Sequence, residues 1–290
     1  MIRPIEKIVE PINATLEDVV KATVKMPCEK HKEKIKPAPK SLLRYPGGKT
    51  RGAKEILKYF PSMIDRVCSP FLGGGSIELE LANKGIQVFG YDVFEPLTSF
   101  WQVLLKNPEG LMEAVRKYYP LTNSKFYSLQ AEYMGIKDKK ERAAVFFVLN
   151  RASFSGTTLS GGMSPGHPRF TPSIIDRLAE FEIDNLIVEN ADFHDSLAKH
   201  TNDFLYLDPP YANGGKLYGE KGDVHESFNH EGLAEIITKR DGWILSYNDC
   251  KIVRELYGDF KKVNLEWAYG MNTNKKSNEL LILSKDFISI

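Results

Sequence analysis

The clearest pattern along the chain is an apolar run, a glycine-rich turn, a helical stretch and a second apolar run. Residues 66–70 predict a short strand, and residues 77–84 predict a helix with Gly85 as its natural C-terminal cap. Residues 86–92 then predict a second strand, with Asp92 at its end. Strand, turn, helix and strand in this order form half of a Rossmann-like α/β unit.

Another apolar run, residues 204–207, predicts a buried strand. Pro209 and Pro210 end it, because each lacks an N–H and fixes φ. The turn therefore presents the Asp208 carboxylate and the Tyr211 ring at the carboxyl end of a strand, where open α/β sheets bind ligands. Such a turn can hold an exocyclic amine, whose two N–H groups donate to the carboxylate and to a turn carbonyl while the ring stacks on the heterocycle. The four residues alone are equally compatible with a plain strand-ending turn.

The turn between the first strand and the helix contains Gly73, Gly74 and Gly75, which let a cofactor approach the backbone closely. Asp92 is placed to bind a ribose diol with both oxygens. The contiguous glycines differ from the G-x-G-x-x-G of dinucleotide sites, and residues 47–50 lack the first glycine that a P-loop needs. We therefore predict a cofactor with a nucleoside but no pyrophosphate, of which S-adenosylmethionine is the obvious example.

Four segments of the chain carry a family resemblance: residues 43–49, 70–76, 149–156 and 208–211. They resemble the motifs of the D12-class, Dam-like DNA adenine-N6 methyltransferases of the alpha group, and they occur in that family's order. The resemblance covers about residues 40–285 and implies a Rossmann-like, S-adenosylmethionine-dependent methyltransferase core with a mainly helical inserted target-recognition domain.

The resemblance implies which residues hold the cofactor and which carry the chemistry. Tyr45 would stack on the cofactor, Lys49 would make polar contacts with it, and Asp192 with Phe193 would bind its adenine. The full set of implied cofactor contacts is Tyr45, Lys49, Pro70, Phe71, Gly73, Gly75, Ser76, Asp92, Asp192, Phe193 and Asp208. The implied catalytic motif is Asp208, Pro209, Pro210 and Tyr211, with Asp208 facing both the cofactor and the target base.

Residues 150–171 are rich in Ser, Gly, Thr and Pro and predict a long loop or loose hairpin. Loops on a rigid scaffold often carry recognition, so Arg151 and Arg169 are candidate phosphate or base contacts. Arg151 is equally suited to an ion pair inside the insertion. Lys275 and Lys276 form a basic run that is typical of either a solvated face or a phosphate contact.

Two departures from the family pattern concern the part of the chain where the family reads its DNA sequence. Ser155 stands where the family usually has asparagine, and residues 157–164 replace the expected basic hairpin. A GATC target is therefore not implied.

We expect three parts along the chain. Residues 1–40 are a polar extension and linker, residues 41–93 plus 184–290 are the catalytic core, and residues 94–183 are the inserted target-recognition domain. The stretch from Ala212 to Phe228, with its glycines and charged residues, could close over the site.

The composition sets bounds on the class of protein. The chain has 290 residues, 42% of them hydrophobic, which is enough for a real core. Its formal net charge of +1 is not that of a strongly basic nucleic-acid binder, and its three cysteines suggest a reducing compartment. Cys28 and His31 are too few ligands for a structural zinc. We expect a cytoplasmic monomer, associated with the nucleoid when acting on double-stranded DNA, with no metal and no membrane segment.

The expected activity is methyl transfer from S-adenosylmethionine to N6 of a flipped-out adenine in DNA. N4-cytosine enzymes usually begin the catalytic motif with serine and protein-glutamine enzymes with asparagine, so Asp208 favours adenine. RNA adenine stays open, because the motif cannot distinguish the sugar. A non-catalytic DNA-binding protein on the same fold is disfavoured by the intact Lys49, Gly73, Asp92 and Asp208. Restriction-linked, phage and housekeeping roles all remain open.

Overall fold

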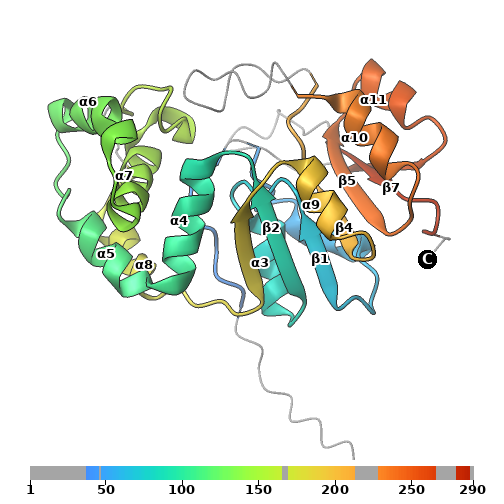
Figure 1. Ribbon diagram of the computed structural model, residues 1–290, viewed down its shortest axis with the longest axis horizontal. Coiled ribbons are helices and arrows are strands. Elements are labelled where there is room, and N and C mark those ends of the chain that lie inside the picture. The colour runs from blue at the N-terminus through green and yellow to red at the C-terminus, as the bar shows by residue number, and fades with distance from the viewer. Residues whose placement is uncertain (1–36, 46, 165–168, 213–227, 266–278, 288–290) are drawn as a thin grey trace, which may run out of the picture. The chain divides into compact units, whose positions relative to one another are not determined.

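The fold is described by a computed structural model of residues 37–45, 47–164, 169–212, 228–265 and 279–287. Within these residues, seven strands form one sheet (Figure 1). The strands are β1 (Arg66–Ser69), β2 (Gln87–Asp92), β3 (Leu186–Asn190), β4 (Phe204–Leu207), β5 (Trp243–Asn248), β6 (Lys261–Leu265) and β7 (Glu279–Leu283).

The strand order is β3-β2-β1-β4-β5-β7-β6, and its first five members follow the Rossmann order 3-2-1-4-5. Those five pair in parallel, whereas β7 runs antiparallel to both β5 and β6. Every residue of β4 and β7 is buried, as expected for strands covered on both faces. The prediction of a Rossmann-like α/β core is confirmed.

Ten α-helices accompany the strands in the described part of the chain. Several begin where a side chain accepts a hydrogen bond from the first turn: Thr122 caps α6, Asp138 caps α7 and Thr171 caps α8. The helices are α2 (Ala53–Ile56), α3 (Ser76–Asn83), α4 (Glu95–Lys106), α5 (Pro108–Arg116), α6 (Asn123–Glu132), α7 (Lys139–Ala152), α8 (Pro172–Ala179), α9 (Phe193–Lys199), α10 (His230–Ile237) and α11 (Lys251–Leu256). Three short 3₁₀ turns, Leu57–Tyr59, Tyr133–Gly135 and Phe154–Gly156, complete the set.

Alternate residues of the strands face two separate cores. In β4, Tyr206 joins the core that contains α3 and α4, whereas Leu205 and Leu207 join the core that contains α9, α10 and α11. In β5, Ile244 faces the first core and Leu245 the second. This period of two places helices on both faces of the sheet.

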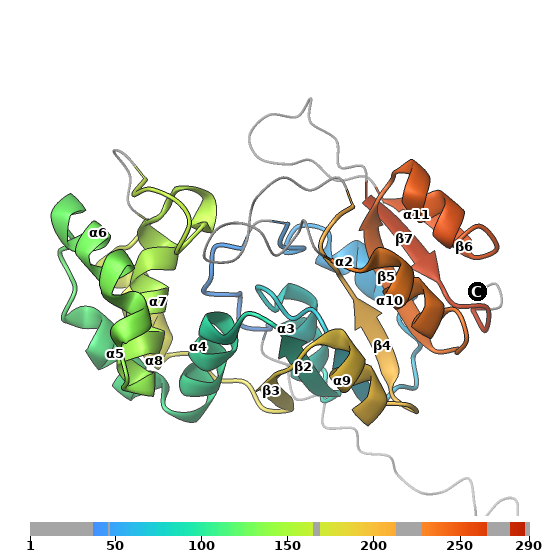
Figure 2. The same cartoon turned by 45° about the horizontal axis from the view of Figure 1, so that its top comes forward.

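Helices α5 to α8 lie between β2 and β3 in the chain and gather beyond α4, at the opposite end of the sheet from β5 and β7 (Figures 1 and 2). Their link to the sheet is α4, which packs against β3 on one side and α7 on the other. The contacts do not separate these helices from the core, because Lys36–Ile290 forms one compact unit. A distinct inserted domain with a recognition role therefore stays a prediction.

Residues 150–171 differ from the predicted loop at their start. Asn150, Arg151 and Ala152 form the last turn of α7, because Asn150 and Ala152 are buried with the rest of the helix. Beyond it, a bridge between Ser153 and Met163 gives the predicted loose hairpin. The N-terminal residues 1–36 and most of the predicted lid, residues 213–227, lie outside the described residues.

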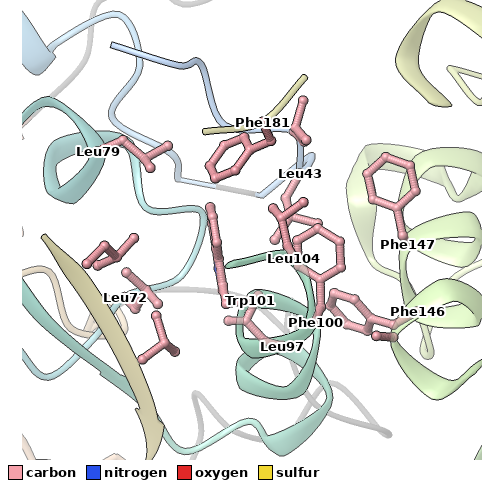
Figure 3. Close-up of a cluster of buried hydrophobic side chains, with 14 of the residues drawn as sticks. Leu43, Leu72, Leu79, Leu97, Phe100, Trp101, Leu104, Phe146, Phe147 and Phe181 are labelled. Atoms are coloured by element: carbon pink, nitrogen blue, oxygen red, sulfur yellow. The ribbon is translucent and has the colours of Figure 1, made fainter. Parts of the chain in front are cut away.

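Two aromatic residues of α4 connect the helical group to the glycine turn (Figure 3). The Phe100 ring stacks on Phe147 of α7, with centroids 5.5 Å apart. The neighbouring Trp101 donates its indole N–H to the Gly73 carbonyl at 3.1 Å. Gly75 has a φ of +68°, and a Cβ atom there would lie 3.0 Å from the Trp101 ring. The turn therefore requires glycine for its backbone conformation and for the space that Trp101 occupies.

We predict that Gly75→Ala destabilises the protein more than Gly85→Ala does. Both positions have positive φ, so both substitutions carry a backbone cost of roughly 1–2 kcal/mol. A Cβ at Gly85 meets nothing within 4 Å, so only G75A adds crowding, worth about 1–3 kcal/mol. The free energy of unfolding in urea measures the difference. Equal losses for the two variants would show that Trp101 does not confine the turn.

Candidate active site

The candidate site lies where the strand order reverses. β1 and β4 are neighbours, yet the chain leaves β1 toward α3 on one face and β4 toward α10 on the other. Ligands of open α/β sheets bind in the crevice at this switch point. A cavity of about 590 Å³ lies there, and every residue predicted to bind the cofactor or carry the catalysis lines it.

The glycine turn forms one wall of the cavity. Gly73 has a φ of +48°, and a Cβ atom there would lie 2.8 Å from Cε1 of Tyr45. The Tyr45 ring therefore packs directly on the turn, in the place where the sequence predicts a stacking residue. Ser76, the first residue of α3, shares a 2.9 Å hydrogen bond with Thr50.

Asp92 is held by two backbone N–H groups. Its Oδ2 accepts from Gly73 at 3.1 Å and its Oδ1 from Phe94 at 3.0 Å. Burial raises the pKa of Asp92 to about 6, and these N–H groups oppose that rise. Each carboxylate oxygen keeps a second lone pair, so both remain able to accept a hydroxyl hydrogen from a ligand.

Asp192 and Phe193, at the start of α9, also line the cavity. Asp192 is exposed and caps the helix, accepting from the Asp195 N–H at 2.9 Å. Phe193 is buried and packs against Phe71 and Phe228, with ring centroids 6.0 and 5.5 Å away. The pair thus presents an acid beside an apolar aromatic surface.

Lys49, which is buried, forms an ion pair with the partly buried Asp208, and both line the cavity. The Lys49 ammonium lies 2.6 and 2.7 Å from the two Asp208 oxygens, and Lys49 is 3% exposed. Burial alone would lower the pKa of Lys49, but Asp208 and the nearby Glu279 outweigh it and hold the pKa above its usual value. Burial acts in the opposite sense on Asp208 and raises its pKa, which Lys49 pulls back down. A salt-bridged carboxylate with a charged lysine against it remains ionised at neutral pH.

Glu279, at the start of β7, is a member of the site that sequence reasoning missed. It is 3% exposed and accepts from the Tyr211 hydroxyl at 2.6 and 2.7 Å and from the Ser246 hydroxyl. Its carboxylate also lies 3.5 Å from the Lys49 ammonium. Glu279 therefore fixes the Tyr211 ring and supplies a second negative charge beside Lys49.

The predicted DNA contacts fall elsewhere. Arg151 and Arg169 line a second hollow next to the main cavity. Arg151 makes no ion pair with a carboxylate among the described residues; it donates to the carbonyls of Arg169 and Leu42. Lys275 and Lys276 lie outside the described residues.

A family comparison identifies the proteins that share these motifs. The family model described as D12 class N6 adenine-specific DNA methyltransferase matches residues 45–271. The chain belongs to this family. The resemblance drawn from the motifs is thereby confirmed, and the protein is a methyltransferase.

Several characterised relatives are similar over most of the chain. Type II methyltransferase M1.LlaDCHI of Lactococcus lactis subsp. cremoris is 26% identical over 262 residues, which cover 82% of this chain and 90% of the relative. DNA adenine methylase of Haemophilus influenzae is 24% identical over 267 residues, which cover 84% of this chain and 92% of the relative. DNA N-6-adenine-methyltransferase of Escherichia phage P1 is 29% identical over 260 residues, 80% of this chain and 33% of that one.

In the described part of this methyltransferase, no three His, Cys, Asp or Glu side chains are grouped so as to hold a metal ion. The same residues include no helix with the length and apolar character to span a membrane.

Glu78 is a second acid of the methyltransferase site that sequence reasoning missed. It lies on α3, is buried, lines the cavity and accepts from the Ser69 hydroxyl at 2.6 Å. Burial raises its pKa to about 7, although the hydrogen bond from Ser69 opposes this. The available signal was its position one turn before the apolar Leu81 and Ala82, because residues three and four apart share a helix face.

We predict a pH-dependent gain in stability for Glu78→Gln. The folded protein binds the Glu78 proton more tightly than the unfolded chain, whose carboxyl titrates near 4.5, so wild-type stability falls as the pH rises from about 4.5 to 7. Glutamine avoids this loss and can still accept from Ser69. E78Q should equal the wild type near pH 4.5 and exceed it by on the order of 1–3 kcal/mol at pH 8.

Urea unfolding at several pH values measures this gap. Glu80→Gln, on the same helix, is the control for losing one carboxylate. A gap that stays constant with pH, or that E80Q shares, would contradict a buried, titrating Glu78.

Proposed function

We propose that this methyltransferase transfers a methyl group from S-adenosylmethionine to N6 of a specific adenine in double-stranded DNA. The observation that carries the proposal is the position of Asp208, Pro209, Pro210 and Tyr211. In a member of the D12 family, they end β4 and face the same cavity as the glycine turn.

The residues of the cavity fit this cofactor. Its volume of about 590 Å³ lies in the range of ordinary ligand sites. Asp92 would bind the ribose hydroxyls, while Asp192 and Phe193 would hold the adenine. The bound cofactor supplies an electrophilic methyl group on a sulfonium.

Asp208 and the Pro209 carbonyl would orient the target amine. Adenine N6 is a poor nucleophile because its lone pair is delocalised into the ring. Asp208 and the Pro209 carbonyl accept its two hydrogens, which localises the lone pair and directs it at the methyl group. Lys49 keeps Asp208 ionised and in place, and each Asp208 oxygen has a second lone pair for the base. The catalytic gain comes from positioning and local electrostatics, and the amine loses its proton after transfer.

Tyr211 would receive the base after it leaves the duplex. A base within the helix cannot reach this cavity, so it must be flipped out at a cost of roughly a few kcal/mol. Stacking on the Tyr211 ring would recover about 1–3 kcal/mol. The hydroxyl bond to the buried Glu279 holds that ring in one orientation.

We predict that Asp208→Asn lowers kcat at least about 100-fold, because its amide cannot supply two ionised acceptor oxygens. Wild type and variant are incubated with mixed-sequence duplex DNA and labelled S-adenosylmethionine, and the digested nucleosides are identified by mass spectrometry. Asp176→Asn, which breaks a surface ion pair with Arg116, is the matched control and should leave turnover unchanged.

N6-methyladenine from the wild type alone would support the proposal. N4-methylcytosine would retain the chemistry and overturn the substrate, and near-normal turnover by D208N would overturn the mechanism.

We predict that Tyr211→Ala raises the KM for DNA more than Tyr211→Phe does. Alanine removes the stacking surface, whereas phenylalanine keeps the ring and loses only the hydroxyl bond to Glu279. Loss of stacking corresponds to roughly a 5- to 150-fold effect. Steady-state kinetics on the same DNA measures both variants. If Y211F is as impaired as Y211A, the hydroxyl and not the stacking surface is what the reaction needs.

A further inference from the structure

A second hollow, of about 510 Å³, opens beside the catalytic cavity. Tyr45, Gly48, Gly74 and Ser76 line both, so the glycine turn and the segment before α2 lie between the two hollows. We call the second hollow the arginine pocket, after Arg44, Arg51, Arg151 and Arg169, which line it. Sequence reasoning singled out only the last two of these arginines.

The described residues that line the arginine pocket include no Asp or Glu. Within the described residues, Arg44, Arg151 and Arg169 make no ion pair with a carboxylate. Elsewhere in the same part of the chain, four arginines each have one: Arg66 with Asp203, Arg116 with Asp176, Arg142 with Glu95 and Arg254 with Asp249.

Backbone carbonyls hold the guanidinium groups in place without neutralising them. Arg44 donates to the Ser153 carbonyl at 2.6 Å. Arg151 donates to the carbonyls of Arg169 and Leu42 at 3.1 and 3.2 Å. Of the five N–H groups that a guanidinium carries, these bonds use few, so donors remain for a ligand.

The cations also act on one another. Burial, together with the charges of Arg44 and Arg169, lowers the pKa of Arg151 to about 10. Burial and Arg169 likewise lower the pKa of Arg44. Crowded like charges are costly, and a bound anion would relieve that cost.

We propose that the arginine pocket binds a backbone phosphate of the DNA strand that carries the target adenine. Guanidinium groups match phosphate oxygens in geometry as well as charge, and the Ser41 and Thr50 hydroxyls add neutral donors. The pocket adjoins the cavity that receives the flipped base, so a phosphate next to that nucleotide is within its reach. This inference rests on the proposed function and adds to it the place where the strand is anchored.

Arg169→Gln tests the pocket. Arg169 is exposed, and the substitution removes its charge while keeping a polar side chain. Arg177→Gln is the matched control, because Arg177 contributes to the same positive field at Arg151 but does not line the pocket. R169Q should weaken binding of the target duplex about tenfold and reduce the slope of log K against log salt by about 0.9. R177Q should keep the wild-type slope, and Arg169→Lys should restore it.

Neutral methylphosphonates, placed one at a time around the target adenine, locate the phosphate. A methylphosphonate at one position should weaken DNA binding by the wild type about tenfold. It should have little further effect on binding by R169Q, as expected when the two changes remove the same contact. Equal losses in both proteins at every position would overturn the inference. The inference would also be overturned if the loss of DNA affinity in R169Q depended on base identity, or if R177Q changed the salt slope as much as R169Q does.

A free anion is the other source of the same chemistry. Calorimetric titration with inorganic phosphate addresses it: binding to the wild type but not to R169Q, with an unchanged DNA salt slope, would overturn the DNA assignment. A failure of the proposed function can be distinguished from a failure of this inference. Absence of N6-methyladenine from the wild type would count against that function, whereas normal methylation with a flat phosphonate scan would count only against the pocket.

Discussion

The buried pairing of Lys49 with Asp208 is the interaction on which the site depends. Two acids meet here, the partly buried Asp208 at the carboxyl end of β4 and the buried Glu279 at the start of β7, and side by side they would repel each other. One ammonium group between them removes that repulsion and joins three distant segments of the chain. Replacing such a group with apolar residues often leaves stability unchanged, so its value here lies in holding an ionised carboxylate at a fixed point.

The glycine turn is constrained by α4. Trp101 bonds to Gly73 and fills the space beside Gly75, while its neighbour Phe100 packs on Phe147 of α7. The same helix, α4, thus supports the cofactor wall and carries the helices between β2 and β3. Any movement of those helices when a large ligand binds would therefore reach the glycine turn through α4.

The sequence sufficed for the local parts of this arrangement. The glycine turn, the acid that ends β2 and the proline turn after β4 were predictable because each is a short motif with its own backbone requirement. Glu279 was not, since it reaches Ser246 and Tyr211 only through the antiparallel pairing of β7 with β5. Nor was the arginine pocket, which unites residues from about 44 to 169. Arg151 was expected in a loop and instead lies in the last turn of α7, where the helix fixes its direction.

Charge is segregated between the two hollows, which explains how a chain of net charge +1 can suit both ligands of the proposed reaction. Among the described residues, Asp92, Asp192 and Asp208 line the catalytic cavity together with Glu78, whose pKa of about 7 leaves it partly protonated at neutral pH, and Lys49 is paired with Asp208. That balance favours a cationic ligand, and a sulfonium cofactor is cationic until its methyl group leaves. The arginine pocket offers the opposite sign to an anionic strand. Because field strength falls with distance and is screened by salt, such short-range separation is more effective than a uniformly basic surface, which would bind DNA everywhere and repel the cofactor.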